Sequence, residues 1–173
     1  MSEPDLELDS RRAIYQRIAD TPGVHFRALL DDLEYAQGTL QYQLRWLADE
    51  GLIDVSDDGK YTRYYPATEF DEGDKAVMNA LRREYSRRIL AHLLTDGPLS
   101  TTELSDRLDK TQSTVSWHLS KLAEAGLVTK ERDGRSVAYE VSDPDRVKYL
   151  YTVHRRSFTD KVVDRLLGLW DSY

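Results

Sequence analysis

The stretch LSTTELSDRLDKTQSTVSWHLSKLAEAGLVTKERDGRSVAYEV, residues 99–141, determines the fold of this chain. Ser100 and Glu103 form a capping-box pattern, in which the hydroxyl and the carboxylate bind free backbone N–H groups and start a helix. Leu104 and Leu108 lie four residues apart and give this helix a buried side. The stretch therefore opens with a short amphipathic helix.

The same stretch continues with a second helix and a hairpin. Residues 111–125 have helical periodicity, and Gly126 can adopt the positive φ of a helix C-terminal cap. Residues 127–132 and 136–141 flank the sequence Asp-Gly-Arg, a turn signal that closes a β-hairpin. Apolar residues before the stretch predict one more helix: Ile89, Leu90, Leu93 and Leu94. The expected order is helix, helix, helix and hairpin.

A copy of this pattern occurs earlier in the chain, over residues 24–66. Each of its residues lies 75 positions before its partner, and the alignment needs no gap. The shared pairs are Leu29/Leu104, Leu33/Leu108, Gln37/Gln112, Thr39/Thr114, Leu44/Leu119, Leu47/Leu122, Ala48/Ala123, Gly51/Gly126 and Gly59/Gly134. Ile14 and Ile18 predict the helix that precedes this copy. Because the shared positions are not low-complexity filler, they indicate a duplicated supersecondary module.

We therefore predict a mainly α fold with small β-hairpins, of the α+β type, in which two modules, residues 1–70 and 71–142, precede a long C-terminal helix, residues 143–173. Apolar residues recur there at steps of three and four. A helix of about thirty residues would span roughly 45 Å, more than one module needs for its own core. We expect it to form a homodimer through Tyr151, Phe158, Val162, Leu166 and Leu169. The alternative is a helix that straps the two modules of one chain together.

Residues 99–141 resemble the winged helix-turn-helix of ArsR- and MarR-type transcription regulators in the helix QSTVSWHL, the exit AGLV and the turn DGR. The first copy, with QGTLQYQLRWLADEGLI and the more acidic hairpin SDDGKYTRYY, is a looser match. The resemblance implies that the second helix of the motif lies in the DNA major groove and the hairpin, or wing, along the DNA backbone. The whole chain is similar to tandem winged-helix regulators of archaea. It lacks the cysteines of metal-sensing ArsR proteins, because it contains no cysteine.

Helical spacing separates the inward and outward faces of residues 111–125. With Val115, Leu119 and Leu122 inward, the outward residues are candidates for reading base edges: Gln112, Ser113, Ser116, Trp117 and Ser120. The residues that would contact the DNA backbone are Thr111, Lys121, Lys130, Arg132 and Arg135. The alternative is a solvated polar face beside a basic turn. His118 matches the family pattern, but we expect it to be partly buried against the first helix rather than to read bases.

The function of the first module has two possible interpretations from the sequence. Its residues at the corresponding outward positions form a second candidate DNA face: Gln37, Gln41, Tyr42, Arg45 and Lys60. Asp54, Asp57 and Asp58 would repel phosphates there, so a protein-contact role is an equal alternative. The arginines of residues 82–88 could contact phosphates or the acidic surface of the first module.

The net charge of −7 is concentrated in the first module. Residues 1–70 contain 7 basic and 14 acidic side chains, whereas residues 71–142 contain 11 and 12. The excess of Asp over Glu and of Arg over Lys is similar to salt-adapted archaeal proteins, in which acidic surfaces are common even when DNA is bound. The negative total is therefore weak evidence against a nucleic-acid partner.

Composition excludes several classes of function. No apolar run approaches the ~20 residues needed to span a bilayer, and no signal segment opens the chain, so we expect a cytoplasmic protein. Phosphate-binding and hydrolase motifs are absent, and His25, His92, His118 and His154 lack metal-ligand spacing. We expect no enzymatic activity, metal or cofactor. The sequence predicts a homodimeric, sequence-specific DNA-binding transcription regulator, with repression favoured over activation. It identifies no effector. The alternative is a tandem winged-helix protein scaffold, similar to segregation-complex partners.

Overall fold

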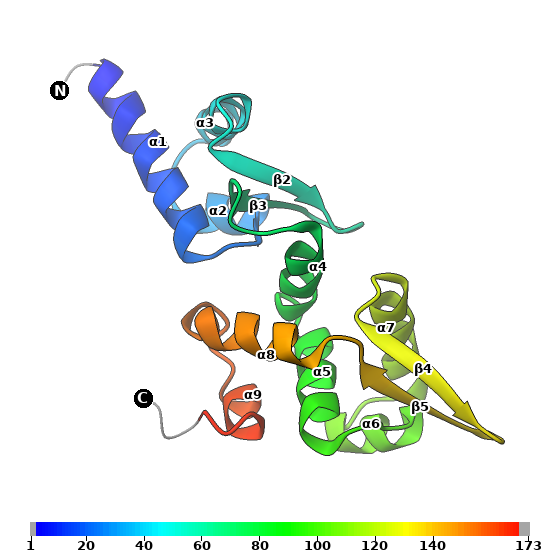
Figure 1. Cartoon of the computed structure of the whole chain (residues 1–173). Helices are drawn as coiled ribbons and strands as arrows, with labels where there is room; N and C mark the ends of the chain where they lie inside the picture. Colours follow the sequence, from blue (N-terminus) through cyan, green and yellow to red (C-terminus); the bar gives the residue numbers. More distant parts are fainter. Residues whose placement is uncertain (1–2, 170–173) are drawn as a thin grey trace. The chain divides into compact units, whose positions relative to one another are not determined.

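The computed structural model describes the backbone of residues 3–169 and the side chains of residues 9–169 (Figure 1). The chain forms two compact units, Met1–Lys75 and Ala76–Tyr173. The boundary falls within α4 (Glu72–Leu81), a helix that the sequence reasoning did not anticipate.

The first unit contains three helices and a small antiparallel sheet. Its elements are α1 (Glu3–Asp20), β1 (Val24–His25), α2 (Phe26–Asp32), α3 (Gln37–Asp49), β2 (Ile53–Asp57) and β3 (Thr62–Pro66). The strand order is β1-β3-β2. Ile14 and Ile18 of α1 are fully buried in one core with Leu29, Leu40 and Leu47. The apolar side of each helix is therefore used in the core of this unit.

The second unit repeats this arrangement. Its elements are α5 (Glu84–Asp96), α6 (Thr101–Leu108), α7 (Gln112–Glu124), β4 (Val128–Asp133) and β5 (Ser136–Val141). The capping box that was predicted at Ser100 and Glu103 is present, with both hydrogen bonds formed. Gly126 has a φ of 77° and follows the last turn of α7, as the sequence predicted. The β4–β5 hairpin extends beyond the helices of its unit (Figure 1).

The strand register confirms the duplication. Val55 pairs with Tyr64 in the first unit, and Lys130 pairs with Tyr139 in the second, which keeps the offset of 75 on both strands. The short strand β1 is repeated too, because Val24 pairs with Tyr64 and an isolated bridge joins Leu99 to Tyr139. The two modules are therefore equivalent in backbone pairing as well as in sequence.

The C-terminal segment is not the single long helix that the sequence predicted. It forms α8 (Pro144–Val153), a 3₁₀ turn η1 (Arg155–Ser157) and α9 (Lys161–Leu166). Thr159 has a φ of 49°, which a continuous helix cannot contain, and the Asp160 carboxylate caps the new helix by accepting the Val162 N–H. Residues 170–173, the end of the predicted helix, lie outside the described residues.

The predicted dimer seam is corrected at two of its positions. Tyr151 and Phe158 are buried in the second unit, where their rings stack with centroids 5.1 Å apart. The Tyr151 hydroxyl donates a hydrogen bond to Asp164, at 2.6 Å. These side chains therefore fold the segment onto its own unit rather than offering it to a second chain. Val162 remains exposed, and Leu166 and Leu169 are half-buried.

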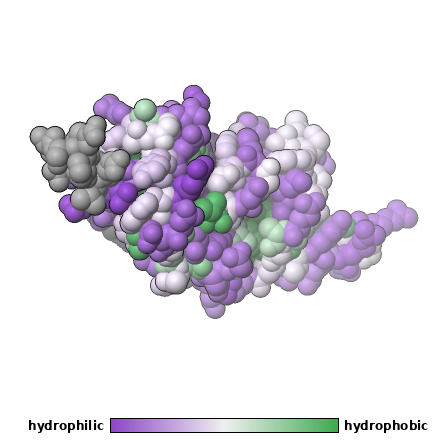
Figure 2. All heavy atoms as spheres, turned by 90° about the horizontal axis from the view of Figure 1, so that it is seen from above, coloured by the Kyte–Doolittle hydropathy of each residue, from purple (hydrophilic) through white to green (hydrophobic). Residues whose placement is uncertain are grey.

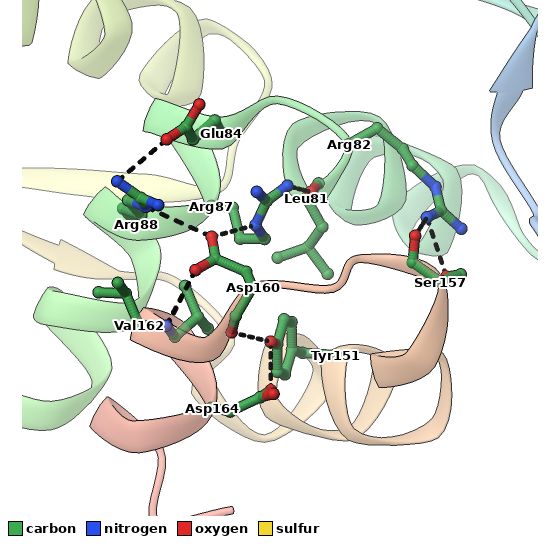
Figure 3. Close-up of polar contacts among 11 residues, drawn as sticks. Leu81, Arg82, Glu84, Arg87, Arg88, Tyr151, Ser157, Asp160, Val162 and Asp164 are labelled. Carbon is green, nitrogen blue, oxygen red and sulfur yellow. Dashed lines mark hydrogen bonds and ion pairs between the residues drawn. The ribbon is translucent and has the colours of Figure 1, made fainter. Parts of the chain in front are cut away.

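Asp160 ties this segment to α5 (Figure 3). Its Oδ2 atom accepts hydrogen bonds from Nε of Arg87, at 2.8 Å, and from Nε of Arg88, at 3.3 Å. Burial by itself raises the pKa of Asp160, but the hydrogen bond and charge of Arg87 outweigh it and lower that pKa. Arg82 donates to Ser157. The expectation that these arginines contact phosphates or the first module is therefore wrong for Arg87, which is buried in this attachment.

The surface is mostly hydrophilic in the view of Figure 2, with apolar atoms confined to small areas. None of the helices in the described part of the chain is both long and apolar enough to cross a membrane.

Candidate nucleic-acid interface

Local interactions fix the N-terminal end of helix α7. Thr111 is its N-cap, and its hydroxyl accepts a hydrogen bond from the Thr114 N–H at 3.3 Å. The turn before it contains Asp109 in the left-handed conformation, with a φ of 52°. Three apolar residues fix the inward face of α7 because they are buried: Val115, Leu119 and Leu122. The orientation of the helix in its unit is thereby set.

The outward face of α7 carries the predicted base-reading residues. Gln112, Ser113, Ser116, Trp117 and Ser120 are all exposed. The serine hydroxyls and the Gln amide can donate and accept hydrogen bonds, as recognition of base edges requires. This face is continuous along the helix, because its members recur at helical spacing.

Trp117 is 53% exposed and sits in a row of aromatic and cationic side chains. Its ring meets His118 edge-on, with centroids 5.0 Å apart, and Lys121 Nζ lies 5.7 Å from the Trp117 centroid. On the other side, His118 contacts Tyr85 of α5 at 5.7 Å, and Lys110 Nζ lies 4.9 Å from the Tyr85 ring. Tyr85 and Lys110 were missed from the sequence, because they lie on other elements and no spacing rule links them to α7.

His118 lies within this row, and the partial burial that the sequence predicted is confirmed. It is partly buried, and its Nδ1 atom has no hydrogen-bond partner among the described residues. Burial lowers the pKa of His118, and the nearby charge of Arg83 lowers it further. The imidazole is therefore neutral near pH 7 and packs as a ring between Tyr85 and Trp117.

The wing of the second unit presents three unpaired cations. Lys130, Arg132 and Arg135 are exposed, and none forms an ion pair with another residue of the described chain. Gly134 has a φ of 61°, which lets the hairpin reverse tightly between β4 and β5. Lys121 differs from these three, since its Nζ lies 3.5 Å from Glu124. The hairpin can therefore place free positive charge against phosphates.

The equivalent face of the first unit is also exposed. Gln37, Gln41, Tyr42, Arg45 and Lys60 all lie at the surface. Tyr42 occupies the position of Trp117 in the repeat and is 54% exposed. Both modules therefore present an aromatic ring at the equivalent position of equivalent helices, α3 and α7.

Two of the three aspartates of the first wing, Asp54 and Asp58, form ion pairs within the unit, which the sequence did not predict. Asp58 and Arg63 form an ion pair of 2.5 Å whose side chains are 5% and 2% exposed. Burial opposes ionisation of Asp58, but hydrogen bonds from Arg63 and from the N–H groups of Tyr61 and Lys60 lower its pKa to about 2. Asp54 pairs with Lys75 at 3.3 Å. The expected repulsion of phosphates is therefore weaker than the count of aspartates implied.

No group of three or more potential metal ligands occurs among the residues that the structure describes.

Comparisons with known proteins found two family matches, one in each part of the repeat. Residues 8–78 match a family described as an N-terminal HTH domain, and residues 83–131 match a family described as a helix-turn-helix domain. An uncharacterized HTH-type transcriptional regulator of Methanocaldococcus jannaschii is 32% identical over 135 residues, 78% of this chain and 34% of that protein. The chain thus spans about a third of the length of this relative.

Other relatives align with a smaller part of the chain. A putative arsenical resistance operon repressor of Halobacterium salinarum is 40% identical over 72 residues, 41% of this chain and 56% of that protein. The solved structure of HlyU from Vibrio cholerae N16961 is 32% identical, covers 49% of this chain and 90% of its own, and has a TM-score of 0.42. The two family matches follow one another along the sequence, and each overlaps one of the two repeated modules. The chain is a tandem helix-turn-helix protein.

Proposed function

We propose that this protein is a sequence-specific, DNA-binding transcription regulator that reads the major groove with α7 of its second module. The observation that carries the proposal is the exposed polar face of α7 beside a wing with three unpaired cations, Lys130, Arg132 and Arg135. Polar side chains on a helix can distinguish base pairs, and cations on a hairpin can bind phosphates without regard to sequence. The matched helix-turn-helix families support the same function.

Repression is the simpler outcome, because occupying a promoter requires nothing beyond binding. Relatives that align with less than half of the chain include a putative arsenical resistance operon repressor of Halobacterium salinarum and a transcriptional activator of Vibrio cholerae. Neither name transfers a target to this chain. We propose a repressor without catalytic activity that acts on DNA in the cytoplasm.

The competing function is a protein scaffold of tandem winged helices. A scaffold does not need free cations on the second wing, nor an exposed Trp117 among polar side chains. Selection of bound duplexes from a random library by the full chain separates the two functions. We expect enrichment of one sequence motif and, after Ser116→Ala and Gln112→Ala together, loss of that enrichment with random-duplex binding retained. Failure of the native chain to enrich any sequence would favour the scaffold.

We propose that the regulator is a homodimer. Because Tyr151 and Phe158 of the predicted seam are buried, the two chains would meet through apolar side chains that the second unit leaves exposed. Tyr149 and Val153 lie four residues apart on α8, are 67% and 55% exposed, and share one helix face. Val162 on α9 is 47% exposed. A two-fold assembly would require a palindromic site with half-sites about 10 bp apart or a multiple of that spacing. Sedimentation of the native chain and of a variant with both Tyr149→Asp and Val153→Asp tests this proposal. We expect a native dimer and a monomeric variant, and a monomeric native chain would contradict the proposal.

A further inference from the structure

The first unit contains a surface groove of about 440 Å³ between α3 and its wing. Its apolar lining consists of Phe26, Leu44, Ala48 and Val55, and the ring of Tyr64 contributes to it. The volume lies within the range of pockets that bind small molecules. Val55, one of these apolar lining residues, is 52% exposed, so the groove leaves apolar surface in contact with water.

The polar side chains that line this groove lack partners in the described chain. Gln41, Arg45, Thr62 and Tyr64 make no side-chain hydrogen bond or ion pair with another described residue. Tyr64 is only 8% exposed as a residue, but its hydroxyl is not among the buried atoms without a partner in the described chain, so the hydroxyl is accessible to a ligand. Burial raises the pKa of Tyr64, so its hydroxyl stays protonated and can donate. The groove therefore combines apolar walls with several unused hydrogen-bond donors.

Arg45 gives the groove its charge. It is the one charged side chain in the described lining, and it is exposed and unpaired. A guanidinium binds a carboxylate with two parallel hydrogen bonds, and such charge-assisted bonds are stronger than neutral ones. The amide of Gln41 and the hydroxyls of Thr62 and Tyr64 can donate to the same acid group.

We propose that this groove binds a small apolar monocarboxylate, with its hydrocarbon or aromatic body against Leu44 and Val55 and its carboxylate on Arg45. The repeat supplies an internal comparison, since the second module has Ser120 and Lys130 in place of Arg45 and Val55. Those residues provide neither the guanidinium nor the apolar wall. The site is thus a property of the first module, and the duplication has been adapted there to a different ligand.

Occupancy of the groove would affect the outward face of α3. Gln41 and Arg45 belong both to the groove and to the second candidate DNA face, so a bound acid would remove them from phosphates. The acid would then act as an effector that weakens DNA binding by the first module, a role that rests on the proposed function. Binding of the acid itself does not depend on DNA and can be measured alone.

The test uses 2-naphthoate as the probe and calorimetric titration of the full chain without DNA. We expect saturable binding, at least about tenfold weaker for Arg45→Gln, as loss of a hydrogen bond between charged groups predicts. Val55→Trp, which fills the groove from an exposed strand position, should abolish binding. The control is Arg27→Gln, the same loss of charge at an exposed arginine of the same unit outside the lining. The neutral 2-naphthalenemethanol should bind more weakly than the acid and be insensitive to Arg45→Gln.

Several results would overturn the site. These are no saturable binding to the native chain, equal weakening by Arg45→Gln and Arg27→Gln, or a Val55→Trp variant that binds like the native chain. Self-association that Val55→Trp removes, without any naphthoate binding, would assign the groove to a second copy instead. A chain that binds naphthoate but selects no DNA sequence would retain the site and reject the regulator, so the two proposals fail separately.

Discussion

The two modules have the same backbone but use their charged residues differently. Helix α3 begins at Gln37 and α7 begins at Gln112. These starts are 75 residues apart, as are the equivalent strand pairs that follow the two helices. In the first wing, Asp58 is buried in an ion pair with Arg63. In the second wing, the equivalent Asp133 is exposed and Arg135 is free. The local arrangement of charge therefore differs between the two wings although their backbone pairing is equivalent.

The largest expected difference between the modules concerns this aspartate. Asp58→Ala leaves the Arg63 guanidinium buried without its partner, which should destabilise the first unit by about 3–5 kcal/mol. Asp133→Ala, at the equivalent exposed position, should change stability by less than about 0.5 kcal/mol. Hydrogen exchange resolved by peptide in urea would compare residues 53–66 with residues 128–141. Equal effects of the two substitutions would show that the buried ion pair does not distinguish the wings.

The same ion pair predicts an acid limb in the stability of the first unit. The pKa of Asp58 is about 2 in the folded chain, below its ordinary value of 3.8. Because the folded-state pKa is the lower one, this stabilisation is complete above about pH 4 and is lost as the pH falls towards about 2. Unfolding of the native chain and of Asp58→Asn between pH 2 and 5 would reveal it. A variant with the same acid limb as the native chain would assign the limb to other carboxylates.

Base reading should separate the two recognition helices. Gln112→Ala should lose about 1–3 kcal/mol of discrimination at one operator position, with random-duplex binding nearly unchanged. Gln37→Ala, the equivalent change in the first module, should leave discrimination intact if α7 alone reads bases. Competition binding against single-base operator variants measures both. Loss of discrimination in both variants would make the first module a second reader.

The wings should differ in salt dependence by a smaller amount. Arg135→Ala removes one proposed phosphate contact and should reduce the slope of log affinity against log salt by about one. Lys60→Ala, at the same turn position of the first wing, should leave the slope unchanged. Titration of operator binding from low to moderate salt gives both slopes. If Lys60→Ala alone lowers the slope, the assignment of the wings is reversed.

The smallest expected effect concerns the start of the two recognition helices. Ala36 and Thr111 are the N-caps of α3 and α7 and have nearly the same extended backbone, but only Thr111 has a capping hydroxyl. Ala36→Thr should therefore stabilise the first unit by about 1 kcal/mol, and Thr111→Ala should destabilise the second by a similar amount. Denaturant unfolding measures both changes. A destabilising Ala36→Thr would indicate that the hydroxyl cannot reach the N–H group there.

Much of this architecture could be predicted because it depends on short-range rules. The capping box at Ser100, the cap glycine Gly126 and the outward face with Trp117 follow from spacing along one element. The row through Tyr85 and Lys110 could not be predicted, since it joins three elements. The apolar groove was missed for the same reason, as Arg45 and Val55 face it from a helix and a strand.

The C-terminal segment shows where periodicity misled the prediction. Apolar residues continue at helical spacing across the break, so the pattern alone could not distinguish one helix from two that fold together. The relevant signal was Asp160, a favoured N-cap residue inside the predicted helix. Its carboxylate both starts α9 and pairs with Arg87, which no pattern within one helix could indicate.

The attachment through Asp160 also separates the unit of duplication from the unit of folding. The repeated segment ends with the wing at residue 141, yet Arg87 inside α5 depends on a carboxylate nineteen positions beyond that end. A second module cut after its wing would keep every residue of the repeat but would leave Arg87 without its counter-ion and uncover the side of α5 that packs against α9. Transplanting this module into another protein therefore requires residues through the end of α9. A fragment that ends where the sequence repeat ends would lack them.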